Sequence, residues 1–116
     1  MRNVPGMDRR QRTQSEERAA RNEVSFRNAN ERLGDKRQEL EISGLSPFLC
    51  ECSDPACTDL IHLSLEQYEH VRTRANWFVV ATGHENGSLA EEHGAYRIIE
   101  KHGEAGRIAE AEDPRK

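Results

Sequence analysis

The sequence has few apolar and very few aromatic side chains: 34% of its 116 residues are hydrophobic, 5% are aromatic and 33% are charged. A chain of this composition cannot bury a large core, and small domains already bury a lower fraction of their surface than large ones. Small domains with a poor core are commonly stabilised by a metal ion or by disulfides. The composition therefore predicts one small domain that needs such a cross-link, with part of the chain left extended or disordered.

Long apolar runs are also absent, and none approaches the roughly 18 residues that a membrane-spanning helix needs. Residues 1–6 contain no apolar stretch of the kind that makes a signal peptide. We therefore expect a cytoplasmic protein with no membrane partner. In that reducing compartment, an odd count of three cysteines argues against a disulfide framework.

Charge is unevenly distributed along the chain. Residues 1–37 carry ten Lys and Arg against six Asp and Glu, whereas residues 38–116 carry seven against fifteen. A nucleic-acid-binding arm would need its basic residues clustered on one face. After Glu16 the basic residues alternate with acids, which is typical of a solvated helix face. The sequence therefore disfavours a nucleic-acid partner.

Residues 1–13 are polar and rich in Arg, which predicts a disordered tail, and residues 14–41 are predicted to form an amphipathic helix. The apolar face of this helix has four members at helical spacing: Phe26, Ala29, Leu33 and Leu40. The opposite face carries charged residues that include Glu23, Arg27 and Glu31. Because the apolar face is thin, this helix must lie on its own domain, on a protein partner or on a second copy of the chain.

Residues 45–103 are predicted to form an α+β domain, a small antiparallel sheet with one short helix. Its strands are expected over 48–52, 60–63, 77–81 and 96–100. Ser64 and Gln67 form an S-x-x-Q capping box, which predicts that the short helix begins directly after the second strand. Residues 104–116 are small and charged, and they are predicted to be a second disordered tail.

The three cysteines, Cys50, Cys52 and Cys57, lie close together in the pattern C-x-C-x₄-C. Zn²⁺ prefers thiolate and imidazole ligands, and its structural sites commonly have Cys₄ or Cys₃His ligand sets. Iron–sulfur clusters usually need four cysteines. Two other interpretations stay open, namely unrelated buried thiols and a redox pair of Cys52 and Cys57 without a C-x-x-C motif. The pattern favours a zinc site.

The fourth ligand must come from elsewhere in the chain, and His84 is the preferred candidate. It follows the most apolar predicted strand and comes directly after Gly83, where the backbone can turn sharply. His62, a water molecule and Asp54 are the alternatives. The remaining histidines, His70, His93 and His102, are predicted to be exposed.

The sequence predicts no catalytic residue. A catalytic zinc would keep a water-filled position and need a general base, and Glu85 is the only suggestive neighbour. The metalloprotease motif H-E-x-x-H and the deaminase motif H-x-E…P-C-x-x-C are absent. Three thiolates around Zn²⁺ leave a net negative charge, which fits a closed structural site better than an electrophilic one.

Residues 48–57 read Phe-Leu-Cys-Glu-Cys-Ser-Asp-Pro-Ala-Cys, and residues 78–85 fit F-x-V-x-x-G-H-E. These segments resemble the F-x-C-E-C-x-D-x-x-C and G-H-E signature of a family of small uncharacterised bacterial proteins, most of them actinobacterial. Weaker similarity extends the resemblance to about residues 26–115, including Asn30-Glu31 and the terminal Asp113-Pro114-Arg115. The resemblance implies a Cys₃His metal site but no established activity.

Two functions are weighed against each other. The first is a zinc-binding, non-catalytic interaction or regulatory module, in which the helix at 14–41 docks on a protein partner or on a second copy. The second is a redox or zinc sensor, in which oxidation of the cysteines ejects the metal and unfolds the domain. A small zinc-dependent hydrolase is the least favoured alternative.

Overall fold

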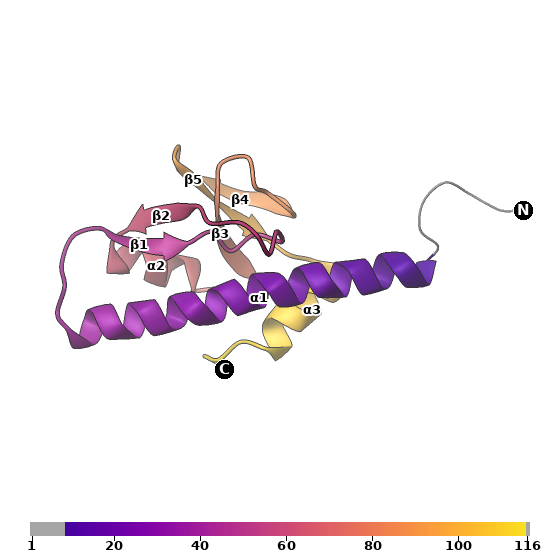
Figure 1. Ribbon diagram of the computed structural model, residues 1–116, viewed down its shortest axis with the longest axis horizontal. Helices are drawn as coiled ribbons and strands as arrows, with labels where there is room; N and C mark the ends of the chain where they lie inside the picture. The colour runs from indigo at the N-terminus through magenta and orange to yellow at the C-terminus, as the bar shows by residue number, and fades with distance from the viewer. Residues whose placement is uncertain (1–8, 116) are drawn as a thin grey trace, which may run out of the picture.

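The computed structural model describes residues 9–115, and it has the predicted α+β fold (Figure 1). A long helix is followed by two small antiparallel sheets and two short helices. The elements in chain order are α1 (Arg9–Glu39), β1 (Ser46–Leu49), β2 (Leu60–Leu63), α2 (Leu65–Val71), β3 (Trp77–Ala81), β4 (Ser88–Glu92), β5 (Tyr96–Glu100) and α3 (Gly103–Ala111). Among the described residues, no helix is long and apolar enough to cross a membrane.

The strands form two sheets where the sequence predicted one. β1 pairs with β2, with Phe48 opposite Ile61, and a second sheet has the order β3-β5-β4. The sequence did not predict β4, because this edge strand is polar and has an irregularity between Leu89 and Glu91 that breaks the alternating pattern. The predicted strand over 48–52 was also wrong in extent, since β1 ends at Leu49 and both following cysteines lie beyond it.

The core lies where the two sheets, α1 and α2 meet. Phe48 of β1 stacks on Tyr68 of α2, with ring centroids 4.6 Å apart. Tyr68 in turn donates a hydrogen bond to the Glu31 carboxylate on α1, at 2.8 Å. The predicted capping box is confirmed: the Gln67 N–H donates to the Ser64 hydroxyl and the Ser64 N–H donates to the Gln67 side chain. Local sequence signals therefore determine where α2 begins.

α1 lies along one side of the molecule and buries a polar face, which corrects the predicted orientation of this helix (Figure 1). The buried members of that face are Ala20, Glu23, Val24, Arg27, Asn30, Gly34 and Arg37. Leu33 and Leu40, predicted to be on the packed face, are 43% and 59% exposed. The polar face can be buried because distant parts of the chain supply a hydrogen-bond partner for most of its groups.

Arg27 illustrates this pairing. Its side chain is fully buried, and its guanidinium donates to the carbonyl oxygens of Ala75 at 2.7 Å and Ala109 at 2.9 Å. The same group lies over the Phe78 ring, 5.0 Å from its centroid. Both carbonyls lie outside the strands, so the guanidinium satisfies backbone acceptors that have no place in a sheet.

The predicted tail over 104–116 was wrong, because residues 103–111 form α3, which packs beside α1 (Figure 1). Ile108 and Ala109 are its buried side chains. Gly106 lets the first turn of α3 lie close to Lys101, the residue after β5, since a Cβ at Gly106 would lie 2.8 Å from the Lys101 carbonyl oxygen. α3 was missed because it buries few apolar side chains and depends on α1. The predicted tail over 1–13 lies mostly outside the described residues, and α1 extends into it as far as Arg9.

The end of α1 provides a test of backbone strain. Glu41 has a φ of 55°, and the Ile42 N–H donates to the Arg37 carbonyl at 3.1 Å, the 6→1 bond of a Schellman motif. Glycine is favoured at this left-handed position. We expect Glu41→Gly to raise the free energy of unfolding by about 0.5–1 kcal/mol, measured by urea denaturation. The matched change Glu39→Gly, inside α1, should lower it by about 0.5–1 kcal/mol. Equal losses in both variants would contradict this account.

Candidate metal centre

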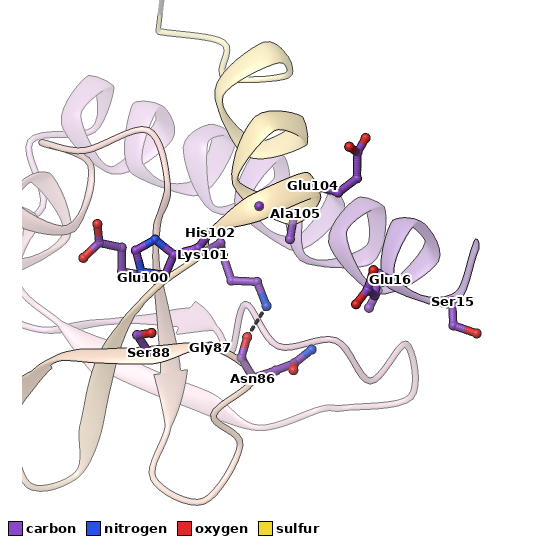
Figure 2. Close-up of a pocket in the computed structure, with 12 residues that line it drawn as sticks. Ser15, Glu16, Asn86, Gly87, Ser88, Glu100, Lys101, His102, Glu104 and Ala105 are labelled. Atoms are coloured by element: carbon purple, nitrogen blue, oxygen red, sulfur yellow. Dashed lines mark hydrogen bonds between the residues drawn. The ribbon is translucent and has the colours of Figure 1, made fainter. Parts of the chain in front are cut away.

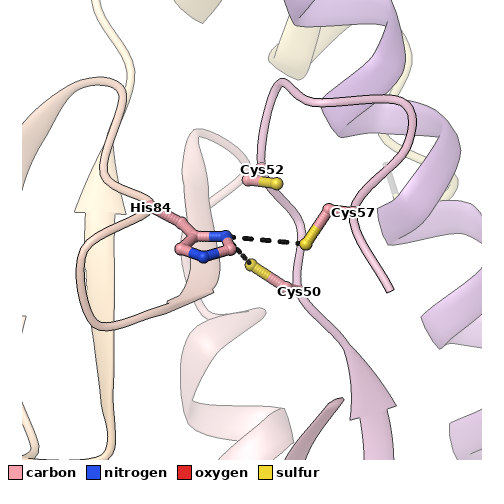
Figure 3. Close-up of side chains that lie close together, drawn as sticks. All are labelled: Cys50, Cys52, Cys57 and His84. Atoms are coloured by element: carbon pink, nitrogen blue, oxygen red, sulfur yellow. Dashed lines mark hydrogen bonds between the residues drawn. The ribbon is translucent and has the colours of Figure 1, made fainter. Parts of the chain in front are cut away.

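The four side chains predicted as metal ligands converge on one point (Figure 3). Cys50, Cys52 and Cys57 come from the segment after β1, and His84 comes from the loop after β3. The four candidate ligand atoms lie within 4.8 Å of one another. His84 Nδ1 is 3.6 Å from the Cys50 sulfur and 3.5 Å from the Cys57 sulfur. The fold thus brings residues from two separate segments to one cluster.

These separations fit a single tetrahedral ion. With metal–sulfur bonds of about 2.3 Å and metal–nitrogen bonds of about 2.0–2.1 Å, a sulfur and a nitrogen on one tetrahedral ion lie about 3.6 Å apart. The two distances from His84 agree with that value. The Cys₃His cluster could therefore bind a metal ion.

The alternative fourth ligands lie elsewhere or have another partner. His62 is on the exposed face of β2, where the side chains alternate between exposed and buried. The Asp54 carboxylate accepts a hydrogen bond from the Ala56 N–H at 2.9 Å, and the Asp54 carbonyl accepts one from the Cys57 N–H at 3.1 Å. Asp54 therefore shapes the turn that brings Cys57 back toward Cys50.

Burial affects the ionisation of two of these thiols. It raises the pKa of the Cys50 thiol, and it is also the largest cause of the raised pKa of the Cys52 thiol. Thiolates are thus disfavoured in this site unless a positive charge compensates for the lost hydration. The Ala81 N–H donates to the Cys50 sulfur at 3.2 Å, which stabilises negative charge on that atom.

Glu51 holds the cysteine segment against β3. Its N–H donates to the Val79 carbonyl at 2.8 Å, and its carboxylate accepts the Val79 N–H at 3.0 Å. The side chain is fully buried, and burial raises the pKa of Glu51 to about 7. Because one residue satisfies both backbone groups of Val79, the segment between Cys50 and Cys52 is attached to β3 without being part of the sheet.

Two asparagines of α1 hold the same segment from the other side. Asn30 donates to the Leu49 carbonyl at 2.9 Å and accepts the Leu49 N–H at 2.8 Å, as a neighbouring strand would. Asn30 also donates to the Glu51 carboxylate at 2.8 Å, and Asn22 donates to the Cys52 carbonyl at 3.2 Å. Neither asparagine was predicted to be a site residue. Asparagine within a helix interior, where its propensity is low, is the signal that could have identified them.

Asp59 is a further residue that the sequence analysis missed. Its carboxylate lies 3.1 Å from His84 Nε2, the ring nitrogen that does not face the sulfurs. Its carbonyl oxygen accepts the Cys50 N–H at 3.2 Å. A carboxylate on the far nitrogen of a histidine ligand orients the ring and makes the other nitrogen a better donor to a metal.

Asp59 therefore gives a direct test of the geometry at His84. We expect Asp59→Asn to weaken metal affinity by about 10–100-fold, measured by competition with a chromophoric chelator. The matched control is Asp35→Asn, a change at an exposed aspartate on α1, which should leave the affinity unchanged. If the two variants bind the metal equally well, the Asp59 contact does not orient His84.

Glu85, the candidate general base suggested by the sequence, is engaged elsewhere. Its carboxylate accepts the Gly83 N–H at 2.9 Å and pairs with the Arg97 guanidinium at 2.9 Å. The backbone hydrogen bond from Gly83 is the main cause of the lowered pKa of Glu85. A carboxylate held in this way turns and stabilises the loop that carries His84.

A hollow of about 670 Å³ lies apart from the cluster, beside α1 and the start of α3 (Figure 2). Lys101, one of its lining residues, donates to the Asn86 carbonyl oxygen and to the Glu23 carboxylate on α1. The hollow shares no lining residue with the Cys₃His cluster. It therefore provides no access to the candidate ligands.

No family model, curated protein or solved structure matches this chain. The described fold is an α+β domain in which a Cys₃His cluster links the segment after β1 to the loop after β3. The case for a function therefore depends on the geometry of that cluster and on the surfaces it holds in place.

Proposed function

We propose that the chain binds one Zn²⁺ through Cys50, Cys52, Cys57 and His84, and that this ion is structural. The supporting observation is the separation of His84 Nδ1 from two sulfurs, 3.5 and 3.6 Å, the spacing of ligands on one tetrahedral zinc. Four protein ligands leave no position for the water that a hydrolytic zinc needs. The resemblance to the bacterial family with the C-E-C and G-H-E signature supports the same ligand set.

The proposed role is a non-catalytic interaction module, and its contact surface is an apolar patch at the end of α1. This patch consists of Leu33, Leu40, Ile42 and Leu45, which are 43%, 59%, 48% and 64% exposed. The four side chains lie within 13 residues of one another in the sequence, and an exposed apolar patch on a small domain commonly marks an interaction site. The chain has few large apolar residues, so leaving four of them in water without a partner would be costly.

We infer that the patch contacts a second copy of the chain. A two-fold contact places the same surface on both sides of the interface. Both signs of charge occur beside the patch in the sequence, with Arg32 and Lys36 near Glu39 and Glu41, and Lys36 pairs with Glu39 within the chain at 3.0 Å. A two-fold contact can therefore place the basic residues of one copy near the acidic residues of the other.

Native mass spectrometry and light scattering test the two parts of the proposal separately. The freshly purified chain should carry one zinc, and a thiol-modifying reagent should release it. Light scattering after size exclusion should give a dimer that Leu40→Gln converts to a monomer. Leu60→Gln, at a leucine that is 53% exposed on β2, is the matched control and should stay dimeric. Protein without metal would overturn the zinc site, and a monomeric native chain would overturn self-association.

One observation favours a redox or zinc sensor as a second candidate function. Cys57 and His84 are partly exposed, whereas Cys50 and Cys52 are buried, so an oxidant can reach the cluster from the Cys57 side. In the proposed step, two thiolates form a disulfide and lose two electrons to hydrogen peroxide. The peroxide takes up two protons to give two water molecules, and Zn²⁺ leaves. Zinc release during a peroxide titration tests this function, and a cluster unaffected by physiological oxidant levels would exclude it.

A further inference from the structure

The loop before β4 contains a dipeptide, Asn86-Gly87, whose side chain and backbone can react with each other. Asn86 is the one asparagine of the sequence that precedes a glycine. Both residues are exposed, and they lie between His84 and the start of β4 at Ser88. Because glycine has no Cβ to hinder the approach, its backbone nitrogen can reach the carbonyl carbon of the preceding asparagine side chain.

The fold requires a glycine at position 87. A Cβ there would lie 3.0 Å from the Glu100 carbonyl oxygen and 3.2 Å from the Lys101 side chain. A larger residue would therefore push the start of β4 away from the end of β5. Close packing at the sheet thus retains the one residue type that leaves Asn86 open to attack from the next backbone nitrogen.

Lys101 contacts the peptide group that joins Asn86 to Gly87 (Figure 2). Its Nζ donates to the Asn86 carbonyl oxygen and also pairs with the Glu23 carboxylate at 3.0 Å. A positive charge on a carbonyl oxygen draws electron density from the adjoining amide nitrogen, so the Gly87 N–H is easier to deprotonate. The deprotonated nitrogen is the nucleophile that closes on the side chain, and Lys101 therefore favours this reaction.

We propose that Asn86 is a site of spontaneous deamidation. The Gly87 nitrogen forms a bond to Asn86 Cγ, and the bond from Cγ to Nδ2 breaks. The leaving nitrogen takes up the proton from Gly87 and departs as ammonia, which leaves a cyclic succinimide. Water then adds to either carbonyl of the ring and opens it, giving aspartate or isoaspartate at position 86. The reaction consumes water alone and changes a neutral side chain into a carboxylate.

The new carboxylate would weaken the attachment of the loop that carries His84. Asn86 Nδ2 donates to the Glu23 carboxylate at 3.5 Å, and an aspartate there would face Glu23 with a like charge. Lys101 would then be shared between two carboxylates. Isoaspartate would also lengthen the backbone by one atom between His84 and β4. The effect on metal binding depends on the proposed zinc site, whereas the modification itself does not.

Peptide mapping by mass spectrometry tests the modification. The full native chain is incubated at neutral pH beside the same chain unfolded in urea, and the change from amide to acid is followed at each asparagine. In the folded chain, Asn86 should convert at least about tenfold faster than Asn76, which precedes Trp77, a barrier difference of about 1.4 kcal/mol. If the folded chain keeps its amide at Asn86 while the unfolded chain loses it, the fold protects the site and the proposal is wrong.

Zinc affinity of the aged chain tests the consequence. Asn86→Gln is the matched control, since glutamine keeps the amide but must close a larger and slower-forming ring. After equal incubation, the native chain should bind zinc about tenfold more weakly than when fresh, and Asn86→Gln should be unchanged. Asn86→Asp should reproduce the loss without incubation. A fully converted chain with undiminished zinc affinity would overturn the effect on the His84 loop, and conversion in a chain that binds no zinc would overturn the metal site alone.

Discussion

Cys50→Ser is expected to remove cooperative unfolding of the chain, as measured by circular dichroism during heating. Structural zinc in small domains contributes an apparent 10–16 kcal/mol, whereas a small protein is stable by about 5–15 kcal/mol in total. Loss of the proposed ion would therefore remove most or all of the free energy that keeps this polar chain folded. Cys50 is the most demanding of the proposed ligand positions, since its sulfur is buried and also accepts the Ala81 N–H.

A strong chelator added to the native chain should reproduce the effect of Cys50→Ser, and added zinc should reverse it. His84→Ala should give an intermediate result, with weaker zinc binding and a lower Tm, because the three sulfurs remain. His62→Ala is the matched control, and its Tm should stay that of the native chain because His62 lies on the exposed face of β2. An unfolding transition unaffected by the chelator would show that the metal is not structural.

The sequence predicted those parts of the fold that depend on neighbouring residues. The strands over 60–63, 77–81 and 96–100 are confirmed, and each is a short, mostly apolar segment between turn signals. The capping box at Ser64 is confirmed for the same reason, because its partner Gln67 is three residues away. The spacing of the cysteines alone predicted that they cluster. The position of His84 directly after the most apolar strand made it the preferred fourth ligand.

The buried face of α1 could not be predicted, because its partners are distant in the sequence. Arg27 is buried against the carbonyls of Ala75 and Ala109, which lie 48 and 82 residues further along the chain. Without those acceptors, apolar spacing favours the face with Leu33 and Leu40. The same reasoning applies to α3. Its few apolar side chains stabilise the helix only when they pack beside α1. Distant polar pairing therefore decides which face of α1 is buried.

Distant polar pairing also positions the segment that carries the cysteines. Cys50 and Cys52 lie beyond β1, so the sheet does not position them. Asn30 of α1 takes the place of a neighbouring strand at Leu49, and Glu51 takes a similar place at Val79. α1 thus supports the Cys₃His cluster and also carries the proposed contact patch. This links the two halves of the proposed function through a single helix.

Asn30→Asp provides the sharpest test of that support, because the two side chains have the same shape. The change removes the donor to the Leu49 carbonyl and to the Glu51 carboxylate. It also places a second carboxylate against the buried Glu51, and two adjacent carboxylates repel each other when no cation lies between them. We expect the free energy of unfolding to fall by about 3–5 kcal/mol, measured by urea denaturation with zinc present.

Gln38→Glu, the same amide-to-carboxylate change at an exposed position of α1, is the matched control and should stay within about 0.5 kcal/mol of the native chain. Metal affinity separates support of the site from a general loss of stability. Under conditions where Asn30→Asp remains folded, its zinc affinity should still fall by at least about tenfold, because the cysteine segment loses its attachment to α1. A destabilised variant that binds zinc as tightly as the native chain would mean that β1 and β3 position the cysteines without help from α1.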